Sequence, residues 1–128
     1  MKISKKAQYG LRAMIFLAKK DKENEVFSLN EISKKEKIPA DFLEKILADL
    51  QKAGLVKTKK GSSGGYFLAK KAKDIFAGDI IEALEDITPV KCQGCGMIAV
   101  CSSKSIWDEV KSSVNEALYS KTLKDLSS

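Results

Sequence analysis

Apolar residues recur at every third or fourth position in the first part of the chain. This spacing predicts a helix over residues 3–20 with a wide apolar face. The members of that face include Ala7, Leu11, Met14 and Ala18. Charged residues over 19–25 follow and form a polar connection. The first helix is therefore expected to bury one face and to end before a loop.

Two further helices are expected after this loop. Ser28 and Glu31 have the spacing of a capping box, in which the hydroxyl accepts from the backbone and the carboxylate reaches back to the cap. A helix therefore begins at residue 29 and runs to about residue 36. Pro39 suits the first turn of a second helix and Gly54 suits its end. That helix buries Phe42, Leu43, Ile46, Leu47 and Leu50. With three residues between them, the two helices predict a helix-turn-helix.

A basic hairpin comes next. Residues 55–59 and 66–69 alternate well enough to predict two short strands. The tip between them is rich in glycine and serine, with Gly61, Gly64 and Gly65. A helix-turn-helix followed at once by such a hairpin is typical of a winged helix.

The C-terminal part predicts two more helices. One is short and amphipathic, over residues 78–86, and the other is longer, over 103–118. The longer helix carries a narrow apolar stripe, close to a coiled-coil seam, formed by Ile106, Val110, Val114 and Leu118. Such a seam favours a homodimer, and packing of this helix on its own domain is the alternative.

The expected fold class is mainly α with a small β-hairpin: a winged helix-turn-helix domain plus a long C-terminal dimerisation helix. The DNA-binding domain is assigned to residues 1–76. A linking helix and a cysteine loop, the expected sensor, take residues 77–102. The dimerisation helix and a C-terminal tail take residues 103–128.

The charge of the chain is unevenly distributed. Residues 1–78 hold 18 Lys and Arg against 9 Asp and Glu, whereas residues 79–128 hold 5 against 8. A basic N-terminal part favours a polyanion such as DNA, and a merely solvated lysine-rich surface is the alternative. The sequence has no apolar run long enough to span a bilayer and does not begin like a signal peptide, so a soluble, cytoplasmic protein is expected.

The winged helix predicts which residues meet DNA. The second helix of the motif enters the major groove, and residues near its N-terminus face the bases. Here these are Ala40, Asp41, Glu44 and Lys45. Glu44 can accept from a cytosine amino group, and Lys45 can donate to guanine or phosphate. Lysines around the turn and along the wing are expected to neutralise phosphates: Lys34, Lys35, Lys37, Lys57, Lys59 and Lys60. Lys60 can also reach the minor groove, and Ser62 and Tyr66 of the wing complete the predicted set.

All three cysteines fall within the stretch CQGCGMIAVC. Cys92, Cys95 and Cys101 have the spacing C-x2-C-x5-C, which suits an iron–sulfur cluster, 2Fe-2S or 4Fe-4S. The stretch lacks a fourth ligand. The candidates are Asp108, Glu109, Gln8 from a second protomer's first helix, or an exogenous small molecule. Zinc is the chief alternative, because C-x2-C is also a zinc-knuckle spacing. A disulfide switch between the first two cysteines, or no ligand-bearing role, is also open.

Nothing in the sequence indicates an enzyme. The chain has no histidine, which removes the commonest general base. The wing stretch KGSSGGY lacks the G-x-x-x-x-G-K-[ST] pattern and lies between strands, so nucleotide binding is not expected.

Three stretches carry a family resemblance over nearly the whole chain: MKISKKAQYGLRAMIFLA, LEKILADLQKAGLVKTKKGSSGGYFLAK and AGDIIEALE. Followed by a cysteine loop and a Trp-bearing helix, they resemble the Rrf2 family of bacterial winged-helix regulators. The resemblance implies a homodimer built through the long C-terminal helix, with both recognition helices and wings on palindromic DNA. It also implies a repressor whose DNA affinity is controlled by a cluster on Cys92, Cys95 and Cys101 that senses iron, redox state or nitric oxide.

The resemblance extends to single residues and has two departures. Glu44 falls on a recognition-helix glutamate that influences site choice, and Lys60 falls where the family often has a wing arginine. Cys92 lies closer to Cys95 than is usual in cluster-binding members, and Lys104 stands where one member has a histidine ligand. The alternatives are a cluster-free winged-helix repressor controlled by zinc, thiol oxidation or a protein partner, and a winged helix used only for protein contact.

Overall fold

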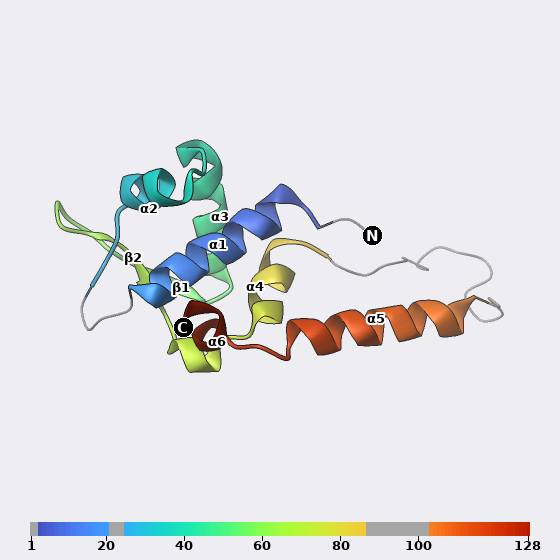
Figure 1. The fold of residues 1–128 in the computed structure, drawn as a ribbon. Coiled ribbons are helices and arrows are strands. Elements are labelled where there is room, and N and C mark those ends of the chain that lie inside the picture. Colours follow the sequence, from blue (N-terminus) through green and yellow to red (C-terminus); the bar gives the residue numbers. More distant parts are fainter. Residues whose placement is uncertain (1–2, 21–24, 87–102) are drawn as a thin grey trace.

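The structure is a computed structural model of the 128-residue chain, and it describes residues 3–20, 25–86 and 103–128. Helix α1 runs through the centre of the body, α2 and α3 cross it on one side, and α5 projects far from the body (Figure 1). The elements are α1 (Lys5–Lys19), α2 (Leu29–Glu36), α3 (Ala40–Lys52), β1 (Val56–Lys59), β2 (Gly65–Leu68), the 3-10 helix η1 (Ala72–Asp74), α4 (Ala77–Leu84), α5 (Lys104–Leu118) and α6 (Leu123–Ser127). The predicted helices and hairpin are confirmed, whereas η1 and α6 were not predicted.

Serine caps start the first two helices. The Ser4 hydroxyl accepts a hydrogen bond from the Ala7 N–H at 3.1 Å, and the Ser28 hydroxyl accepts one from the Glu31 N–H at 3.1 Å. The expected capping box at α2 forms only in part. The Glu31 carboxylate accepts from the Ser28 hydroxyl at 3.3 Å and not from the Ser28 backbone N–H. The same hydroxyl thus donates to the carboxylate and accepts from the Glu31 N–H.

The predicted three-residue turn joins α2 to α3. Lys37 takes the left-handed conformation, with φ 55° and ψ 48°, and so ends α2. Two bonds close the turn: the Ile38 N–H donates to the Ser33 carbonyl at 3.1 Å, and the Ser33 hydroxyl donates to the Ile38 carbonyl at 2.5 Å. Pro39 is the N-cap of α3, one position earlier than expected, and its carbonyl accepts from the Leu43 N–H at 2.9 Å.

One apolar core joins α1, α2, α3, the hairpin, α4 and α6. The predicted face of α3 is confirmed, since Leu43, Ile46, Leu47 and Leu50 are all fully buried. Phe42 is the exception and lies half-buried against this core. The core thereby fixes the rotation of α3 and leaves its other face outside.

The wing is an antiparallel hairpin with one extra backbone partner. Its register pairs Val56 with Leu68 and Lys59 with Gly65, so each strand lies one residue from its predicted bounds. Phe27 bridges β2 from outside, because its N–H donates to the Tyr66 carbonyl at 3.0 Å and its carbonyl accepts from the Tyr66 N–H at 2.7 Å. A Cβ on Gly65 would lie 2.3 Å from the Phe27 carbonyl oxygen, which explains the glycine there.

The C-terminal tail returns to the body after α5. The Ala77 N–H donates to the Lys121 carbonyl at 3.1 Å, and the Leu123 N–H donates to the Ile75 carbonyl at 2.7 Å. Leu123, the first residue of α6, is fully buried in the core. The tail therefore anchors the C-terminal end of α5, while its other end lies away from the body (Figure 1). Among the described segments, none of the helices is long and apolar enough to cross a membrane.

Candidate nucleic-acid interface

The two faces of α3 differ sharply. One face is buried in the core, and the opposite face exposes Asp41, Glu44 and Lys45, with Ala40 half-buried at the start of the helix. The structure therefore brings the four predicted base-facing residues together on the outer side of the first two turns. An acidic and a basic side chain lie next to each other there, which suits selective contact with base edges.

The lysines around the turn extend this surface. Lys34 and Lys35 lie exposed in the last turn of α2, and Lys37 lies exposed in the turn itself. Cations are favoured at this end of a helix by its dipole. These three side chains are thus compatible both with helix stability and with contact to a phosphate backbone.

The wing divides into two faces. Lys57 and Lys59 alternate with Thr58 along β1 and are exposed, and Lys60 and Ser62 lie exposed at the tip. Tyr66 pairs with Thr58 and so lies on the other face of the hairpin, where it is half-buried against the core. The structure does not bring Tyr66 together with the wing lysines.

Tyr66 instead lies within electrostatic reach of α3. Burial raises the pKa of its phenol, and the negative charge of Glu44 raises it further. The wing and α3 are therefore electrostatic neighbours, and Glu44 is the residue of the predicted set that links them.

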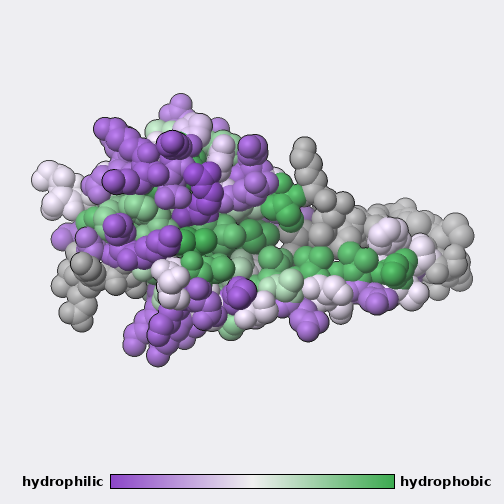
Figure 2. Space-filling model, viewed as in Figure 1, coloured by the Kyte–Doolittle hydropathy of each residue, from purple (hydrophilic) through white to green (hydrophobic). Residues whose placement is uncertain are grey.

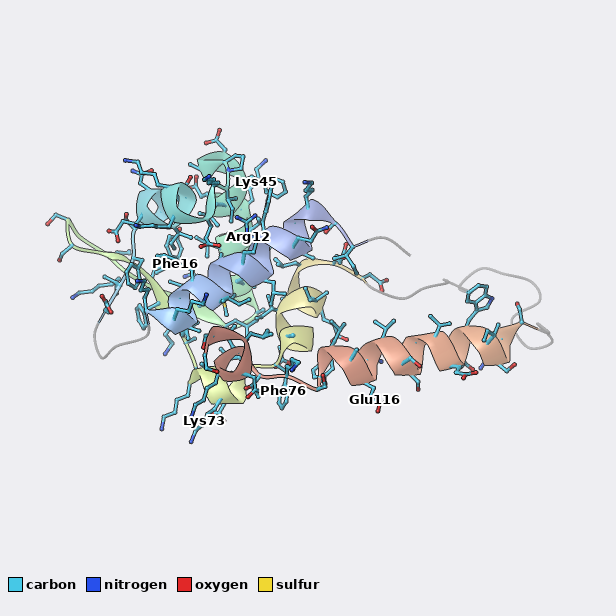
Figure 3. The ribbon with its side chains drawn as sticks, viewed as in Figure 1. Arg12, Phe16, Lys45, Lys73, Phe76 and Glu116 are labelled. Atoms are coloured by element: carbon cyan, nitrogen blue, oxygen red, sulfur yellow. The ribbon has the colours of Figure 1, made fainter. Side chains whose placement is uncertain are left out.

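Contacts between α1 and the helix-turn-helix were missed by sequence reasoning. Arg12 donates to the backbone carbonyl of Glu36 at the end of α2, and Lys6 forms an ion pair with Asp49 near the end of α3. The hydrogen bond from Lys6 is the main cause that lowers the pKa of Asp49. Figure 3 shows Arg12 on the side of α1 that faces α2 and α3. The only signal in the sequence is that Arg12 is the sole arginine of the chain.

Helix α5 has no buried residue, although its apolar stripe is present as predicted. Ile106 is 49% exposed and Trp107 is 39% exposed, while Val110, Val114 and Leu118 are half-buried. Figure 2 shows hydrophobic atoms along α5 that continue onto the body. Exposed apolar stripes of this kind are typical of surfaces that contact another protein chain.

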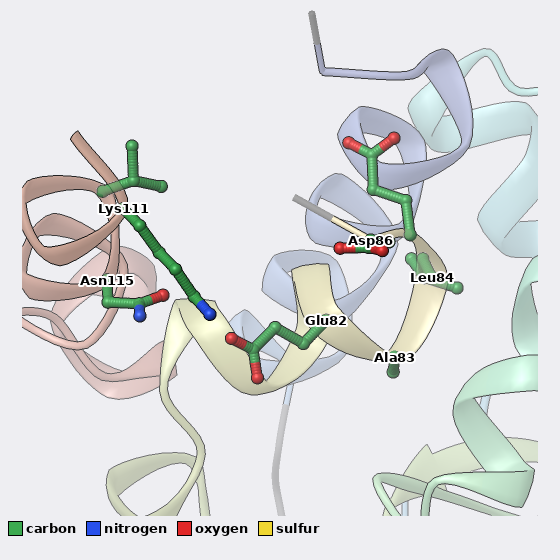
Figure 4. Close-up of a pocket in the computed structure, with 8 residues that line it drawn as sticks. Glu82, Ala83, Leu84, Asp86, Lys111 and Asn115 are labelled. Atoms are coloured by element: carbon green, nitrogen blue, oxygen red, sulfur yellow. The ribbon is translucent and has the colours of Figure 1, made fainter. Parts of the chain in front are cut away.

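A hollow of about 520 Å³ lies between α4 and α5. Glu82, Glu85 and Asp86 lie on its α4 side, and Lys111 extends from α5 toward Glu82 (Figure 4). The Tyr119 hydroxyl donates to the Glu82 carboxylate at 2.8 Å, which ties the end of α5 to α4.

The candidate metal ligands Cys92, Cys95 and Cys101 lie outside the described residues. Within the described segments, no group of three or more His, Cys, Asp or Glu is arranged to hold a metal ion. Of the proposed fourth ligands, Gln8 donates through its side-chain amide to the Ile3 carbonyl at 2.9 Å. Asp108 accepts from Lys104 at 2.8 Å, and Glu109 is exposed on α5.

Sequence comparison gives matches over nearly the whole chain. Residues 3–128 match the family model described as Rrf2, an iron-dependent transcriptional regulator. The HTH-type transcriptional regulator CymR of Bacillus subtilis is 41% identical over 129 residues, which cover 100% of this chain and 91% of CymR. Protein rrf2 of Nitratidesulfovibrio vulgaris is 37% identical over 131 residues, which cover 98% of this chain and 87% of that protein.

Solved structures give the same result for the fold. CymR of B. subtilis, described as that organism's global cysteine regulator, matches with a TM-score of 0.85 and 38% identity, covering 99% of this chain and 96% of CymR. The T. potens IscR matches with a TM-score of 0.82 and 40% identity, covering 98% of this chain and 85% of IscR. The likeness confirms the predicted winged helix-turn-helix.

Proposed function

The chain belongs to the Rrf2 family of transcriptional regulators, and from this premise we propose that it binds palindromic operator DNA as a homodimer and represses transcription there. Membership confirms the predicted family and the prediction that the protein is a regulator and not an enzyme. The observation that carries the proposal is the exposed outer face of α3, held in place by a fully buried inner face and flanked by a basic wing.

In this proposal α3 lies in the major groove. Glu44 accepts from a cytosine amino group, and its charge repels phosphate, so it favours binding only where the correct donor is present. Lys45 donates to guanine or to a phosphate, and Asp41 and Ala40 border the same bases. Phosphates are neutralised by the exposed lysines of the turn and wing: Lys34, Lys35, Lys37, Lys57, Lys59 and Lys60.

The second protomer covers the apolar stripe of α5. Support comes from Ile106 and Trp107, whose large side chains remain exposed in one chain. Because two copies related by a two-fold axis present two recognition helices, the operator has two half-sites about one helical turn apart. Residues 103–128 then serve as the dimerisation segment, and residues 77–102 link it to the winged domain.

We place the sensor at Cys92, Cys95 and Cys101, which hold an iron–sulfur cluster through three thiolates. The donor set fits such a cluster, because thiolates are the ligands it prefers, and the family is described as iron-dependent. When bound, the cluster supplies iron that reacts with oxygen, nitric oxide or reductants. The fourth ligand comes from the second protomer or from a small molecule.

Contacts made by the helices on either side of the sensor segment give it a route to DNA. Before it, the Glu85 carboxylate accepts from the Ser4 N–H at 3.1 and 3.2 Å, which fixes the end of α4 to the start of α1. After α5, Tyr119 holds α4 through Glu82. In this proposal a change in the segment between α4 and α5 moves α5 relative to the winged domain, so the binding of metal and the binding of DNA are reciprocally linked.

A cluster-free regulator is the second candidate. The short spacing between Cys92 and Cys95 favours it, since that pair also fits a zinc site or a disulfide switch. Control would then come from zinc, from thiol oxidation or from a protein partner.

Two measurements test the proposal. Duplexes selected from a random library by the purified protein should contain an inverted repeat, and log K against log salt should fall with a slope of about −11 for about twelve phosphate contacts, six from each protomer of the proposed dimer. Selection without symmetry, or a slope near zero, contradicts the DNA-binding proposal.

The sensor is tested on protein purified without oxygen. Equal iron and acid-labile sulfide, with visible absorbance bands, are expected. Replacing Cys92, Cys95 and Cys101 together by alanine should then remove the difference in operator affinity between loaded and metal-free protein. A colourless, iron-free protein after reconstitution supports the cluster-free candidate instead.

A further inference from the structure

The chain contains one arginine and 22 lysines, and the arginine touches the helix-turn-helix. Arg12 lies on α1, and its Nη2 donates to the backbone carbonyl of Glu36. Its Nε also lies 3.6 Å from the Glu36 carboxylate. Glu36 is the last residue of α2, where carbonyls lack partners within the helix. Arg12 therefore provides a hydrogen-bond donor for a carbonyl at the C-terminal end of the first helix of the motif.

A second set of contacts connects Arg12 to the recognition helix. The guanidinium carbon lies 5.5 Å from the centroid of the Tyr9 ring, one turn earlier on α1. The Tyr9 ring meets the Phe42 ring edge-on, with centroids 5.7 Å apart and planes at 78°. Phe42 is the third residue of α3. In sequence it stands between Asp41 and Glu44, which belong to the proposed base-reading face. One cation thus contacts the end of α2 directly and the start of α3 through a single ring.

Lysine cannot supply the same set of contacts. The guanidinium is planar and carries several donors in a fixed fork, so it can donate to a carbonyl while it lies against an aromatic ring. A lysine ammonium on a flexible stem offers one point charge. In a chain that uses lysine everywhere else, this geometry gives a physical reason for arginine at position 12.

We infer that Arg12 is a positioning residue that determines operator specificity by holding α3 at a fixed angle to α2, without itself touching DNA. The inference rests on the proposed function of α3. The Ser33 and Ile38 bonds close the turn from inside, and Arg12 braces it from outside. Base-edge hydrogen bonds require the helix to be aligned within a small fraction of a base step, whereas phosphate contacts tolerate small rotations.

The exposure of Arg12 separates this role from a role in stability. Its side chain is 46% exposed, and exposed ion pairs contribute little to the free energy of unfolding. Loss of the Arg12 contacts is therefore expected to leave the protein folded and to change the angle between α3 and α2.

The experiment compares Arg12→Ala and Arg12→Lys with Lys19→Ala, which removes one exposed cation from the other end of α1. Each protein is titrated with an operator duplex selected by the wild type and with a shuffled duplex of equal composition, over a series of salt concentrations. Both Arg12 variants should reduce the ratio of the two affinities about 100-fold, because one base contact worth about tenfold is misaligned in each of the two half-sites. Lys19→Ala should leave the ratio unchanged. Arg12→Lys should keep the wild-type salt slope.

Two results overturn the inference. If Arg12→Ala weakens both duplexes equally and lowers the salt slope by about 1.8, one phosphate contact from each protomer, while Arg12→Lys restores binding, Arg12 is a phosphate contact. If neither variant changes the ratio, it has no role in specificity. Tyr9→Leu removes the ring and keeps the cation, and it serves as the test if Arg12→Ala does not fold. A loss in the affinity ratio smaller than that expected for Arg12→Ala supports the inference. An unchanged ratio overturns it. A wild-type protein without operator preference contradicts the proposed function, and this inference with it.

Discussion

The helices of the body and helix α5 have the same spacing of apolar residues, but they differ in how far these residues are buried. In the body, α3 buries Leu43, Ile46, Leu47 and Leu50 completely. Helix α5 is longer, with 15 residues against 13, yet it has no fully buried residue, and Ile106 is half-exposed. The period of a pattern thus predicts a helix in both places, but it does not predict what covers the apolar face.

The difference separates the part of the chain that buries its own apolar face from the part that leaves its apolar face largely uncovered. Elements of the body cover one another, and the tail adds Leu123 to the same core. Among the described residues, the hydrogen bonds that tie α5 to the body lie near its C-terminal end, through Tyr119 and the following backbone. Its apolar stripe is therefore available to the second protomer of the proposed dimer.

The largest expected effect is on the core. Leu50→Ala should lower the free energy of unfolding by about 2–5 kcal/mol, because it opens a cavity around a fully buried residue. Ile106→Ala, measured by urea denaturation under conditions where the chain is monomeric, should cost less than about 0.5 kcal/mol. Equal losses for the two variants would show that α5 packs on its own body.

The second effect is on association. Ile106→Glu combined with Trp107→Glu should weaken the dimer on the order of 100-fold, since two charges replace apolar surface that a partner buries. Sedimentation velocity over a concentration series measures it. The control is Ser112→Glu on the opposite side of α5, which should leave the dimer intact. A dimer that persists in the double variant would place the interface elsewhere.

The third effect concerns the joint between the two regions. A Cβ at Gly78 would lie 2.3 Å from Tyr119 Cε2, so Gly78→Ala should cost about 1–3 kcal/mol of unfolding free energy by overpacking. In a Tyr119→Ala background the same change should cost nothing, because the ring is gone. If the losses of unfolding free energy in this double-mutant cycle are additive, the Tyr119 ring does not pack against Gly78.

The fourth effect is a gain in stability. Lys37→Gly should raise the free energy of unfolding by about 1 kcal/mol, because Lys37 holds a left-handed conformation that glycine adopts without strain. Lys35→Gly, inside α2, should lower it by about the same amount. On DNA, Lys37→Gly should also reduce the salt slope by about 1.8, the loss of one phosphate contact from each protomer of the proposed dimer.

The smallest effect is a titration. Burial, assisted by the hydrogen bond to Glu82, raises the pKa of Tyr119 to about 12, above its usual value near 10. The contribution of this bond is complete below pH 10 and is lost as the pH rises through about 12. Absorbance at alkaline pH should show a late-ionising tyrosine that is absent from Tyr119→Phe. The bond is contradicted if the variant and the wild type titrate alike.

Local signals predicted most of the body. The cap at Ser28, the glycine at Gly54 with φ 79° and the spacing on α3 each depend on neighbouring residues alone, so the sequence is sufficient to place them. Because the buried residues of α3 could be identified from their spacing, the residues on its exposed face could be predicted as well. Its candidate DNA residues were therefore predictable in place, although no contact with DNA follows from the fold alone.

Contacts between distant residues were not predictable in this way. Arg12 and Glu36 are 24 positions apart, and Tyr119 and Glu82 are 37 apart. The side of the hairpin on which Tyr66 lies depends on the register with Thr58, and a shift of one residue would have reversed it. Helix α6 is only five residues long, too short to show a period.

The proposal that α3 reads operator DNA is tested most directly by the sequences that wild type and Glu44→Ala select from one random duplex library. The account predicts inverted repeats for both proteins, with two chains bound per duplex. Glu44→Ala should lose the preference for cytosine at one position in each half-site and keep the rest. Identical selected sequences for the two proteins, or selection without an inverted repeat, would contradict the account.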